Sequence, residues 1–581
     1  MTWARCWRQA AALVAASALL ASLPALAAET HDVDPLAIGR SIYREGVLPS
    51  GQPLQGIGQA RVTLAGAQAA CATCHRRSGY GSSEGPIEVR AITGPALSGE
   101  RVAPAAPGGP SSPAAVAANP GNLSAAEAAR ANADVLRSVR TAALAGKRQR
   151  PAYDDAALTR AIGEGIDVAG RVMNAAMPRY ALDAAELASL TAYLKSLSVQ
   201  ASPGVTEDTV HFATVIQPGT DPAQRRALVE VLQTYIRDRN LGMRTELRRE
   251  QAGIVRLQRT YREWVLHVWD LSGASDTWAA QLEAYNRQQP VFALVSGLGN
   301  AGWRPIHDFS ERFEVPCILP QVDVPVLDER GFYTVYLSRG MTLEAQALAK
   351  YLRDTGERGP VMQLHRRDEA SATGAAAFRK AWAADAGAGP LEDRVLDETL
   401  GEASWQQLAR HAAGATVVLW LKPQDLVQAQ ALTVAASPVK AVYLSSSLVD
   451  GKRTGLAADA GGRVRLVYPQ DPPAARETRL ALVKRWLLSN GLALTDEKVQ
   501  MNAYLAATVT AMVVSHSKDT YSREFLIERM EHRLGTAHEL SIYPHMSLGP
   551  GQRFASKGSY IVRVGGADDR ELTPLSDWIV P

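Results

Sequence analysis

The sequence predicts a multidomain chain in which a small all-α domain precedes a two-lobed α/β region. From Thr209 onward, short apolar runs rich in β-branched residues alternate with helical patterns, which is typical of parallel sheets with crossover helices. Before residue 198 the periodic segments have helical spacing only. A chain of 581 residues is long enough for several domains of ordinary size.

Composition excludes several classes of protein. The chain has 62 Lys and Arg against 59 Asp and Glu, so we expect no binding to nucleic acid. Four cysteines are too few for a disulfide scaffold of this size. Since 46% of the residues are hydrophobic, we expect buried cores that are stable without disulfides.

The first 27 residues have the three-part pattern of a secretory signal peptide. Arg5 and Arg8 precede an apolar run that ends before Pro24, and small residues follow. The run is about 14 residues long, whereas a membrane-spanning helix needs about 20. A retained membrane anchor is the alternative. We expect export to the periplasm, with no membrane span in the mature chain.

Composition also suggests the domain boundaries. We place the first domain at 30–198, with an insertion rich in Ala and Pro at 101–124. A linker at 199–207 then leads to the α/β region at 208–581.

The α/β region contains eight predicted strands in two groups of four. A break between Asp354 and Gly359 separates the groups. We therefore expect one lobe at about 208–345, completed by a return of the carboxyl-terminal end, and a second at about 355–475. The predicted strands are 209–216, 264–270, 290–296, 315–319, 359–365, 416–421, 440–445 and 463–468, and the clearest helices are 221–239, 277–287 and 343–354.

A C-x-x-C-H string in the first domain predicts one covalent haem c. Cys71 and Cys74 are spaced to add across the two vinyl groups of a haem, and His75 then places an imidazole under the iron. A thioredoxin-like redox pair and half of a zinc site are the alternatives. The chain has no second C-x-x-C, and no βαβ pattern surrounds this one.

The haem iron then needs a sixth ligand, for which Met177, Met173 and His31 are the candidates. Pro178 restricts Met177 toward an extended conformation, which suits a loop passing across the haem face. Thioether ligation raises the potential of the haem and suits electron transfer. An iron without a sixth ligand would instead favour a haem enzyme such as a peroxidase.

Three segments of the first domain, CATCHRRSGYGS, ITGPALSG and GEGIDVAGRVMNAAMPRYALDAAELASLTAYLKSL, resemble class I cytochromes c. The resemblance implies that a helix at 35–45 containing Gly39 and Tyr43 crosses the last helix, at 183–197, near Tyr193. One departure is the spacing, because 102 residues separate the two predicted iron ligands, which is longer than usual.

The segments HFATVIQPGTD, QPVFALVSGLGNAG, FEVPCILPQVD and VYLSRGMTLEAQALAKYLRD resemble type I periplasmic binding proteins, the kind that bind branched-chain amino acids for ABC transporters. The resemblance implies a ligand held in a cleft between two lobes that close by hinge motion. The strong amino-acid grip usual in that family is not evident, so the ligand class stays open. The implied ligand-binding residues are Gln217, Ser296, Gly297, Gln321, Arg339, Ser445 and Ser446.

The string from Gly297 to Gly302 also matches the dinucleotide-binding pattern G-x-G-x-x-G, with Asp323 further along the chain. It follows the third strand of the series rather than the first, and no helical pattern begins cleanly there. We therefore expect no dinucleotide.

These patterns together predict a periplasmic electron-transfer protein, in which a haem c domain is joined to a binding module for a small ligand or a redox partner. The partner would be a periplasmic dehydrogenase or a component of a terminal oxidase chain. The alternative is an ABC-type solute-binding receptor, or a redox-dependent ligand sensor, in which haem is a modulator. We assign no catalytic residue.

Overall fold

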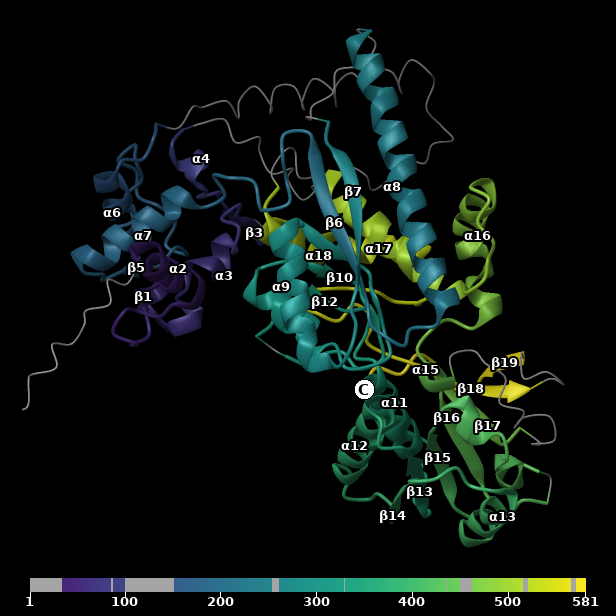
Figure 1. Cartoon of the computed structure of the whole chain (residues 1–581). Helices are drawn as coiled ribbons and strands as arrows, with labels where there is room; N and C mark the ends of the chain where they lie inside the picture. Colours follow the sequence, from purple (N-terminus) through teal and green to yellow (C-terminus); the bar gives the residue numbers. More distant parts are fainter. Residues whose placement is uncertain are drawn as a thin grey trace, which may run out of the picture. The chain divides into compact units, whose positions relative to one another are not determined.

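The computed structural model describes residues 34–84, 87–99, 151–252, 261–328, 330–434, 436–449, 462–515, 521–565 and 571–581. They belong to two compact units (Figure 1). Unit 1 runs to His75, resumes at Ile92 and ends at Leu197, whereas unit 2 takes Arg76–Ala91 and Ser198–Pro581. The predicted signal peptide, the insertion at 101–124 and the candidate ligand His31 lie outside the described residues.

Two helices form the core of unit 1, as the sequence predicts. Helix α2 spans Pro35–Glu45 and helix α7 spans Ala184–Ser196. The Asp183 side chain accepts a hydrogen bond from the amide of Glu186, whose carboxylate accepts one from the amide of Asp183. This reciprocal pair satisfies two amides that the start of a helix otherwise leaves without partners.

The two helices cross where α2 carries a glycine. A Cβ added to Gly39 would lie 2.2 Å from the carbonyl oxygen of Ser189, so only glycine allows the backbones to approach this closely. One turn further, the rings of Tyr43 and Tyr193 pack with their centroids 5.4 Å apart. The helix crossing that the cytochrome resemblance implies is confirmed.

Unit 1 also contains a small antiparallel sheet, so the expectation of an all-α domain is wrong in this respect. Its strand order is β2-β1-β5. Each strand has three residues or fewer, which is too short for an alternating pattern to appear in the sequence. The strands are β1 (Gln55–Ile57), β2 (Thr63–Ala65) and β5 (Arg179–Tyr180), and the shorter helices are α3 (Cys71–His75), α4 (Gly94–Leu97) and α6 (Asp155–Gly163).

The first lobe of unit 2 is built on a parallel sheet in the order β11-β9-β6-β8-β10-β12, with β7 also paired to β6. All four strands predicted for this lobe are present in it. The strands are β6 (Thr209–Ile216), β7 (Glu263–Asp270), β8 (Ala293–Val295), β9 (Leu298–Gly299), β10 (Cys317–Ile318), β11 (Gln321–Val322) and β12 (Thr334–Val335).

Helices cover this sheet, and the last three of them come from the carboxyl-terminal part of the chain. Buried residues of α17 pack in one core with buried residues of β6, which confirms the predicted return of the chain to the first lobe. The helices are α8 (Pro222–Gln251), α9 (Trp278–Gln288), α10 (Arg304–Arg312), α16 (Pro473–Ser489), α17 (Glu497–Ser515) and α18 (Arg523–Arg533). Helix α8 ends 12 residues later than its apolar pattern predicts.

The second lobe has a sheet in the order β14-β13-β15-β16-β17-β18-β19, in which β18 and β19 run antiparallel to their neighbours. The four strands predicted for this lobe are present. The strands are β13 (Val361–His365), β14 (Leu391–Val395), β15 (Thr416–Trp420), β16 (Ala441–Ser445), β17 (Val464–Tyr468), β18 (Tyr560–Gly565) and β19 (Glu571–Pro574). Its helices are α11 (Met341–Asp354), α12 (Glu369–Ala383), α13 (Glu402–His411), α14 (Pro423–Leu426) and α15 (Ser446–Val449).

Helix α11 belongs to the second lobe along its whole length. Met341 and Leu348 pack in one core with Phe378 and Trp420. The start of this helix therefore packs in the core of the second lobe, whereas the boundary at about 345 would place it in the first lobe. No helix in the described parts of the chain has the length and apolar character needed to cross a bilayer.

Candidate haem and ligand sites

The predicted haem-attachment string forms the one-turn helix α3. Cys71 and Cys74 are three residues apart on this helix, and neither is in a disulfide. The hydroxyl of Thr73 donates to the carbonyl of Ala67 at 2.8 Å, which fixes the turn that precedes the helix. Burial raises the pKa of Cys71 to about 12, and the nearby Cys74 contributes to the shift.

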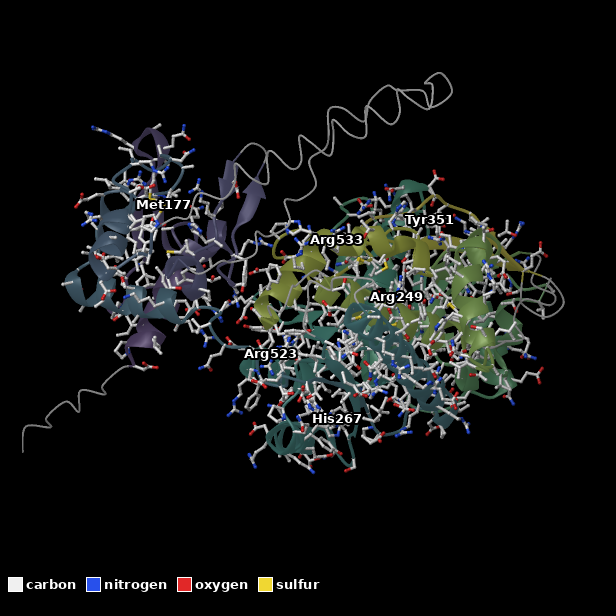
Figure 2. The ribbon with its side chains drawn as sticks, turned by 90° about the horizontal axis from the view of Figure 1, so that it is seen from above. Met177, Arg249, His267, Tyr351, Arg523 and Arg533 are labelled. Atoms are coloured by element: carbon white, nitrogen blue, oxygen red, sulfur yellow. The ribbon has the colours of Figure 1, made fainter. Side chains whose placement is uncertain are left out.

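The candidate sulfur ligands lie on one loop that leads into β5. Figure 2 labels Met177 among the side chains of unit 1. The guanidinium of Arg179 donates to the carbonyl of Met177 and, at 3.2 Å, to the carbonyl of Met173. One side chain therefore fixes the backbone at both methionines, and the choice between them stays a prediction.

Tyr180 connects this loop to the cysteine helix. Its hydroxyl is buried and donates to the carbonyl of Ala69 at 2.8 Å. Burial raises the pKa of Tyr180, and the neighbouring thiols of Cys71 and Cys74 raise it further. Unit 1 therefore brings β5 next to both cysteines, two residues after Met177.

This donor set fits haem c in its chemistry. Two thiols outside any disulfide can form the thioether bonds, and His75 at the end of α3 supplies an imidazole. Met177 is partly exposed, and so is His75. Among the described residues, no three His, Cys, Asp or Glu side chains are grouped to hold a bare metal ion.

In the first lobe, the side chain of the predicted ligand residue Gln217 forms hydrogen bonds with the protein backbone. Its amide nitrogen donates to the carbonyl of Gly302 at 3.1 Å, and its amide oxygen accepts from the amide of Ala301 at 3.0 Å. A Cβ on Gly299 would lie 2.3 Å from that oxygen. The side chain of Gln217 therefore packs against the G-x-G-x-x-G loop, and the expectation of no dinucleotide stays a prediction.

Two other predicted residues lie together, Ser296 directly after β8 and Gln321 at the first position of β11. The Gln321 amide nitrogen donates to the Ser296 hydroxyl at 3.3 Å and to the carbonyl of Val499 at 3.1 Å. Asn502 of α17 donates to the Gln321 oxygen at 3.4 Å. All three side chains are buried, and sequence reasoning missed Asn502.

Gly297 and Arg339 have different surroundings. Gly297 has a φ of 134° and packs against Trp303, where an added Cβ would lie 3.0 Å from the indole ring. Arg339 is exposed, with its guanidinium carbon 5.4 Å from the centroid of the Phe554 ring. Their roles in binding stay predictions.

In the second lobe, the predicted serines surround a buried carboxylate that sequence reasoning also missed. Glu344 is 1% exposed, and one of its oxygens accepts from the amide and the hydroxyl of Ser447. Ser445 lies nearby with its hydroxyl 3.6 Å from the Met341 sulfur, and Ser446 begins α15. Burial raises the pKa of Glu344 to about 7. The sequence could have indicated this buried carboxylate, because Glu344 lies on a face of its helix that is otherwise apolar.

Two buried acceptors in this region have no donor among the residues that the structure describes. They are Oε2 of Glu344 and Oδ1 of Asn502. The pKa of Tyr543 is raised by burial and is further influenced by a hydrogen bond to Asn502 and by the charges of Asp323 and Glu344, so these groups are neighbours. We call Gln321, Glu344, Asn502 and Tyr543 the buried polar cluster. The unmatched Oδ1 of Asn502 suits a ligand that presents an N–H or O–H donor, and Oε2 of Glu344 suits such a donor when the carboxyl group is ionised.

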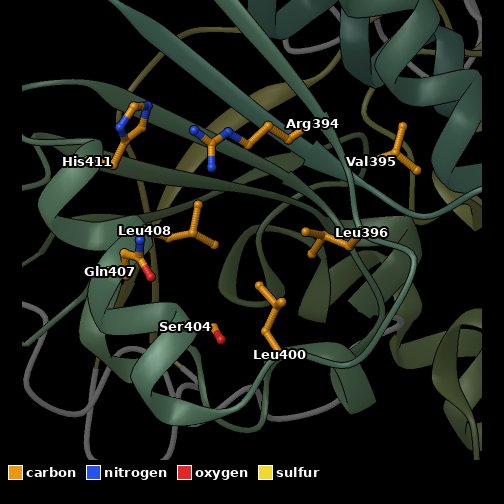
Figure 3. A pocket seen from close by; sticks show the side chains of 8 residues that line it. All are labelled: Arg394, Val395, Leu396, Leu400, Ser404, Gln407, Leu408 and His411. Atoms are coloured by element: carbon orange, nitrogen blue, oxygen red, sulfur yellow. The ribbon is translucent and has the colours of Figure 1, made fainter.

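A separate groove of about 490 Å³ lies between the end of β14 and helix α13 (Figure 3). Three leucines form part of its lining. The side chains of Arg394 and His411 at one end both bond to the carboxylate of Glu392. None of the predicted ligand residues lines this groove.

No family model and no curated protein matches the chain. Solved structures similar to it include a leucine binding protein from Thermotoga maritima MSB8 (13% identity, 64% of this chain, 99% of that chain, TM-score 0.45). A second is a branched chain amino acid ABC transporter protein from Thermus thermophilus with bound valine (11% identity, 64% of this chain, 97% of that chain, TM-score 0.45). A third is a fatty acid ABC transporter substrate-binding protein from Thermomonospora curvata (13% identity, 66% of this chain, 95% of that chain, TM-score 0.45). The two-lobed α/β architecture of unit 2 itself follows from the strand order of its two sheets.

Proposed function

We propose that the chain is an exported small-molecule-binding protein of the type I periplasmic-binding kind, and that its unit 1 carries one covalent haem c. Binding is the function that the architecture of unit 2 supports best. In open parallel sheets, ligands bind outside the carboxyl ends of the strands, and here Ser296 directly follows β8 and Ser445 ends β16.

The observation that carries the binding function is the pair of buried acceptors, at Glu344 and Asn502, that have no donor in the described part of the chain. Leaving such groups unpaired costs on the order of 1–3 kcal/mol each, which a ligand with N–H or O–H groups would relieve. We therefore propose that the buried polar cluster binds the donor end of a small molecule.

Thermal-shift and calorimetric titrations of the full chain with leucine, valine, fatty acids and short alcohols test this function. The ligand that raises the melting temperature should bind at least tenfold more weakly to Glu344→Gln. The control is Glu283→Gln, which removes a carboxylate that pairs with the exposed Arg312. Equal affinity of the wild type and Glu344→Gln would show that the buried polar cluster does not bind this ligand.

The second function, electron transfer, is favoured by α3 with its two thiols, neither of which is in a disulfide. When bound, haem c supplies a one-electron exchange between ferrous and ferric iron. Cys71 and Cys74 would hold the group covalently, while His75 and Met177 would bind its iron. The electron partner would be a periplasmic dehydrogenase or a component of a terminal oxidase chain.

Covalent attachment is tested by replacing both cysteines. Cys71→Ala with Cys74→Ala should abolish the haem signal that stays with the wild-type chain on a denaturing gel, and a retained signal would refute attachment. Met177→Ala should remove the charge-transfer absorption between the methionine sulfur and ferric iron. If that absorption persists, Met173 is the ligand, and rapid binding of carbon monoxide to the wild type would indicate that the iron has no sixth ligand.

A further inference from the structure

Two histidines face each other on neighbouring strands of the first lobe. His211 lies on β6 and His267 lies on β7, and the two strands pair in parallel over eight residues. Nδ1 of His211 and Nε2 of His267 are 2.9 Å apart, and the ring centroids are 5.2 Å apart. The strands therefore bring two imidazole nitrogens from distant parts of the sequence to one point.

The pair lies on the face of the sheet that α9 covers. His211 precedes Ala213 by two positions and His267 precedes Trp269 by two, so each histidine shares a face of its strand with the later residue. Ala213 and Trp269 pack in one core with residues of α9. Both histidines are half-buried. A rigid sheet therefore holds the pair within reach of solvent.

A threonine hydroxyl holds the second nitrogen of the first ring. Oγ1 of Thr209 is 3.0 Å from Nε2 of His211, the nitrogen that does not face His267. The hydroxyl of Thr206 lies 2.7 Å from Oγ1 of Thr209 and accepts from the amide of Thr209 at 2.9 Å, so the Thr209 side chain is itself fixed. When Nε2 of His211 donates to Thr209, Nδ1 presents a lone pair toward His267. Histidines that bind metals commonly have their other nitrogen held by a hydrogen-bond partner in this way.

Both imidazoles are neutral in neutral solution. Burial lowers the pKa of His211 and that of His267, and the neighbouring His267 lowers the pKa of His211 further. The ordinary pKa of histidine is about 6.5, so few of these rings hold the second proton that would compete with a metal ion. The neutral imidazole is the form that binds metals.

The separation of the two nitrogens favours one coordination geometry. With metal–nitrogen bonds of about 2.0–2.1 Å, two ligands at a right angle lie about 2.9 Å apart, whereas two ligands at a tetrahedral angle lie about 3.3 Å apart. The observed distance of 2.9 Å matches the right angle. Right angles between nitrogen ligands are typical of Cu²⁺ and Ni²⁺, whereas Zn²⁺ prefers the tetrahedron, and Cu²⁺ binds such sites more tightly than Ni²⁺.

We propose that His211 and His267 form a binding site for Cu²⁺, with water in the remaining positions of the ion. The ion replaces the hydrogen bond between the rings, which turn so that both lone pairs converge on it. The proton of that hydrogen bond moves to the other nitrogen of the same ring, so both rings stay neutral and the copper keeps its oxidation state. The site shares no residue with the buried polar cluster, and it does not depend on the proposed haem.

Equilibrium dialysis of the full chain, kept oxidised, against Cu²⁺ counts the ions that it retains. His211→Gln and His267→Gln should each retain one ion fewer per chain than the wild type. Thr209→Val keeps both imidazoles but should weaken the binding of this ion at least about tenfold, because His211 loses the partner of its second nitrogen. The control is His411→Gln, which removes an exposed imidazole of the second lobe and should retain as many ions as the wild type.

Two further measurements apply to the Cu²⁺-loaded chain. Electron paramagnetic resonance should show hyperfine splitting from two nitrogens, and His267→Gln should remove it. In the wild type, Cu²⁺ should slow carbethoxylation of His211 and His267 at least about tenfold, because the ion occupies the lone pairs that react. This rate needs no variant, so it decides the question even if the variants do not fold. Folded variants that retain as many ions as the wild type would overturn the proposal, and so would an unchanged rate of carbethoxylation.

Discussion

The backbone amide of Gly302 in the first lobe donates a 2.6 Å hydrogen bond to the carboxylate of Glu369, the first residue of α12 in the second lobe. A Cβ on residue 302 would lie 2.2 Å from that carboxylate, so the contact requires glycine. This bond joins the two lobes directly, and it stabilises the arrangement in which they are together.

Glu369→Ala should therefore shift the full chain toward conformations in which the lobes are farther apart. Small-angle scattering should report a larger radius of gyration than for the wild type. Gly302→Ala should act in the same direction, because its methyl group displaces the carboxylate. Glu402→Ala, at the first position of α13, is the control and should not change the scattering. Identical scattering for all variants would contradict the role of this contact.

The buried Glu344 should make stability depend on pH. Burial raises its pKa from 4.5 to about 7. The folded state then holds a proton that the unfolded state releases, so stability should fall as pH rises from about 4.5 to about 7. The loss should be at most about 4 kcal/mol, since one pKa unit corresponds to about 1.4 kcal/mol.

Urea unfolding at several pH values measures this slope. Glu344→Gln should reduce it, because the amide cannot ionise. Burial raises the pKa of Glu528 to about 7 as well, so part of the slope should remain in that variant. Glu283→Gln should keep the full slope, and an unchanged slope in Glu344→Gln would show that Glu344 titrates at its ordinary pKa.

The helix crossing in unit 1 should tolerate no side chain at residue 39. Gly39→Ala should destabilise unit 1 by about 2 kcal/mol, because its methyl group would meet the Ser189 carbonyl. The matched control is Gly242→Ala in α8, where nothing lies within 4 Å, and it should stabilise the helix by up to about 1 kcal/mol. Calorimetry resolves both effects, and equal melting temperatures for the two variants would contradict the crossing.

Arg523, labelled in Figure 2, should be essential for the stability of the first lobe. It is 6% exposed, and its guanidinium donates to four backbone carbonyls. Burial lowers its pKa to about 10. Arg523→Met leaves those carbonyls without donors and should cost about 3 kcal/mol or more. The acceptor residues are Pro203, Val291, Phe292 and Phe313.

Arg523→Lys should recover part of this loss, because an ammonium group keeps the charge but offers three donors instead of five. The exposed Arg485 of α16 provides the control, and Arg485→Met should leave the melting temperature almost unchanged. The order of melting temperatures should be wild type, then Arg523→Lys, then Arg523→Met. Any other order would contradict this account of the guanidinium.

The sequence predicts the strands that are long and buried, and it misses those defined by pairing. The run 209–216 agrees with β6 residue for residue, because a parallel strand covered on both faces is continuously apolar. Strands such as Leu298–Gly299 and Gln321–Val322 have two residues each. Their pairing with neighbouring strands makes them strands, and no periodicity in the sequence marks them.

The candidate sites also differ in how far the sequence alone predicts them. The haem-attachment string is recognisable because all its chemistry lies within five residues. Asn502 meets Gln321 across 181 positions of sequence, and Glu531 meets Arg76 across 455. Each of these residues looks like an ordinary polar position of a helix or loop when read alone. Their roles arise from tertiary packing, which local patterns do not encode.

The boundary between the two units at Arg76 limits which segments of this chain can be replaced by those of another protein. A recombination event at residues 199–207 would replace residues 76–91 together with unit 1. The new chain would then present Glu528 and Glu531 with residues that have not evolved beside them. A successful exchange of the preceding segment must therefore preserve an arginine at 76 and a serine at 78. The segment that must be exchanged as a whole therefore does not end at the linker predicted at 199–207, because residues 76–91 belong to unit 2.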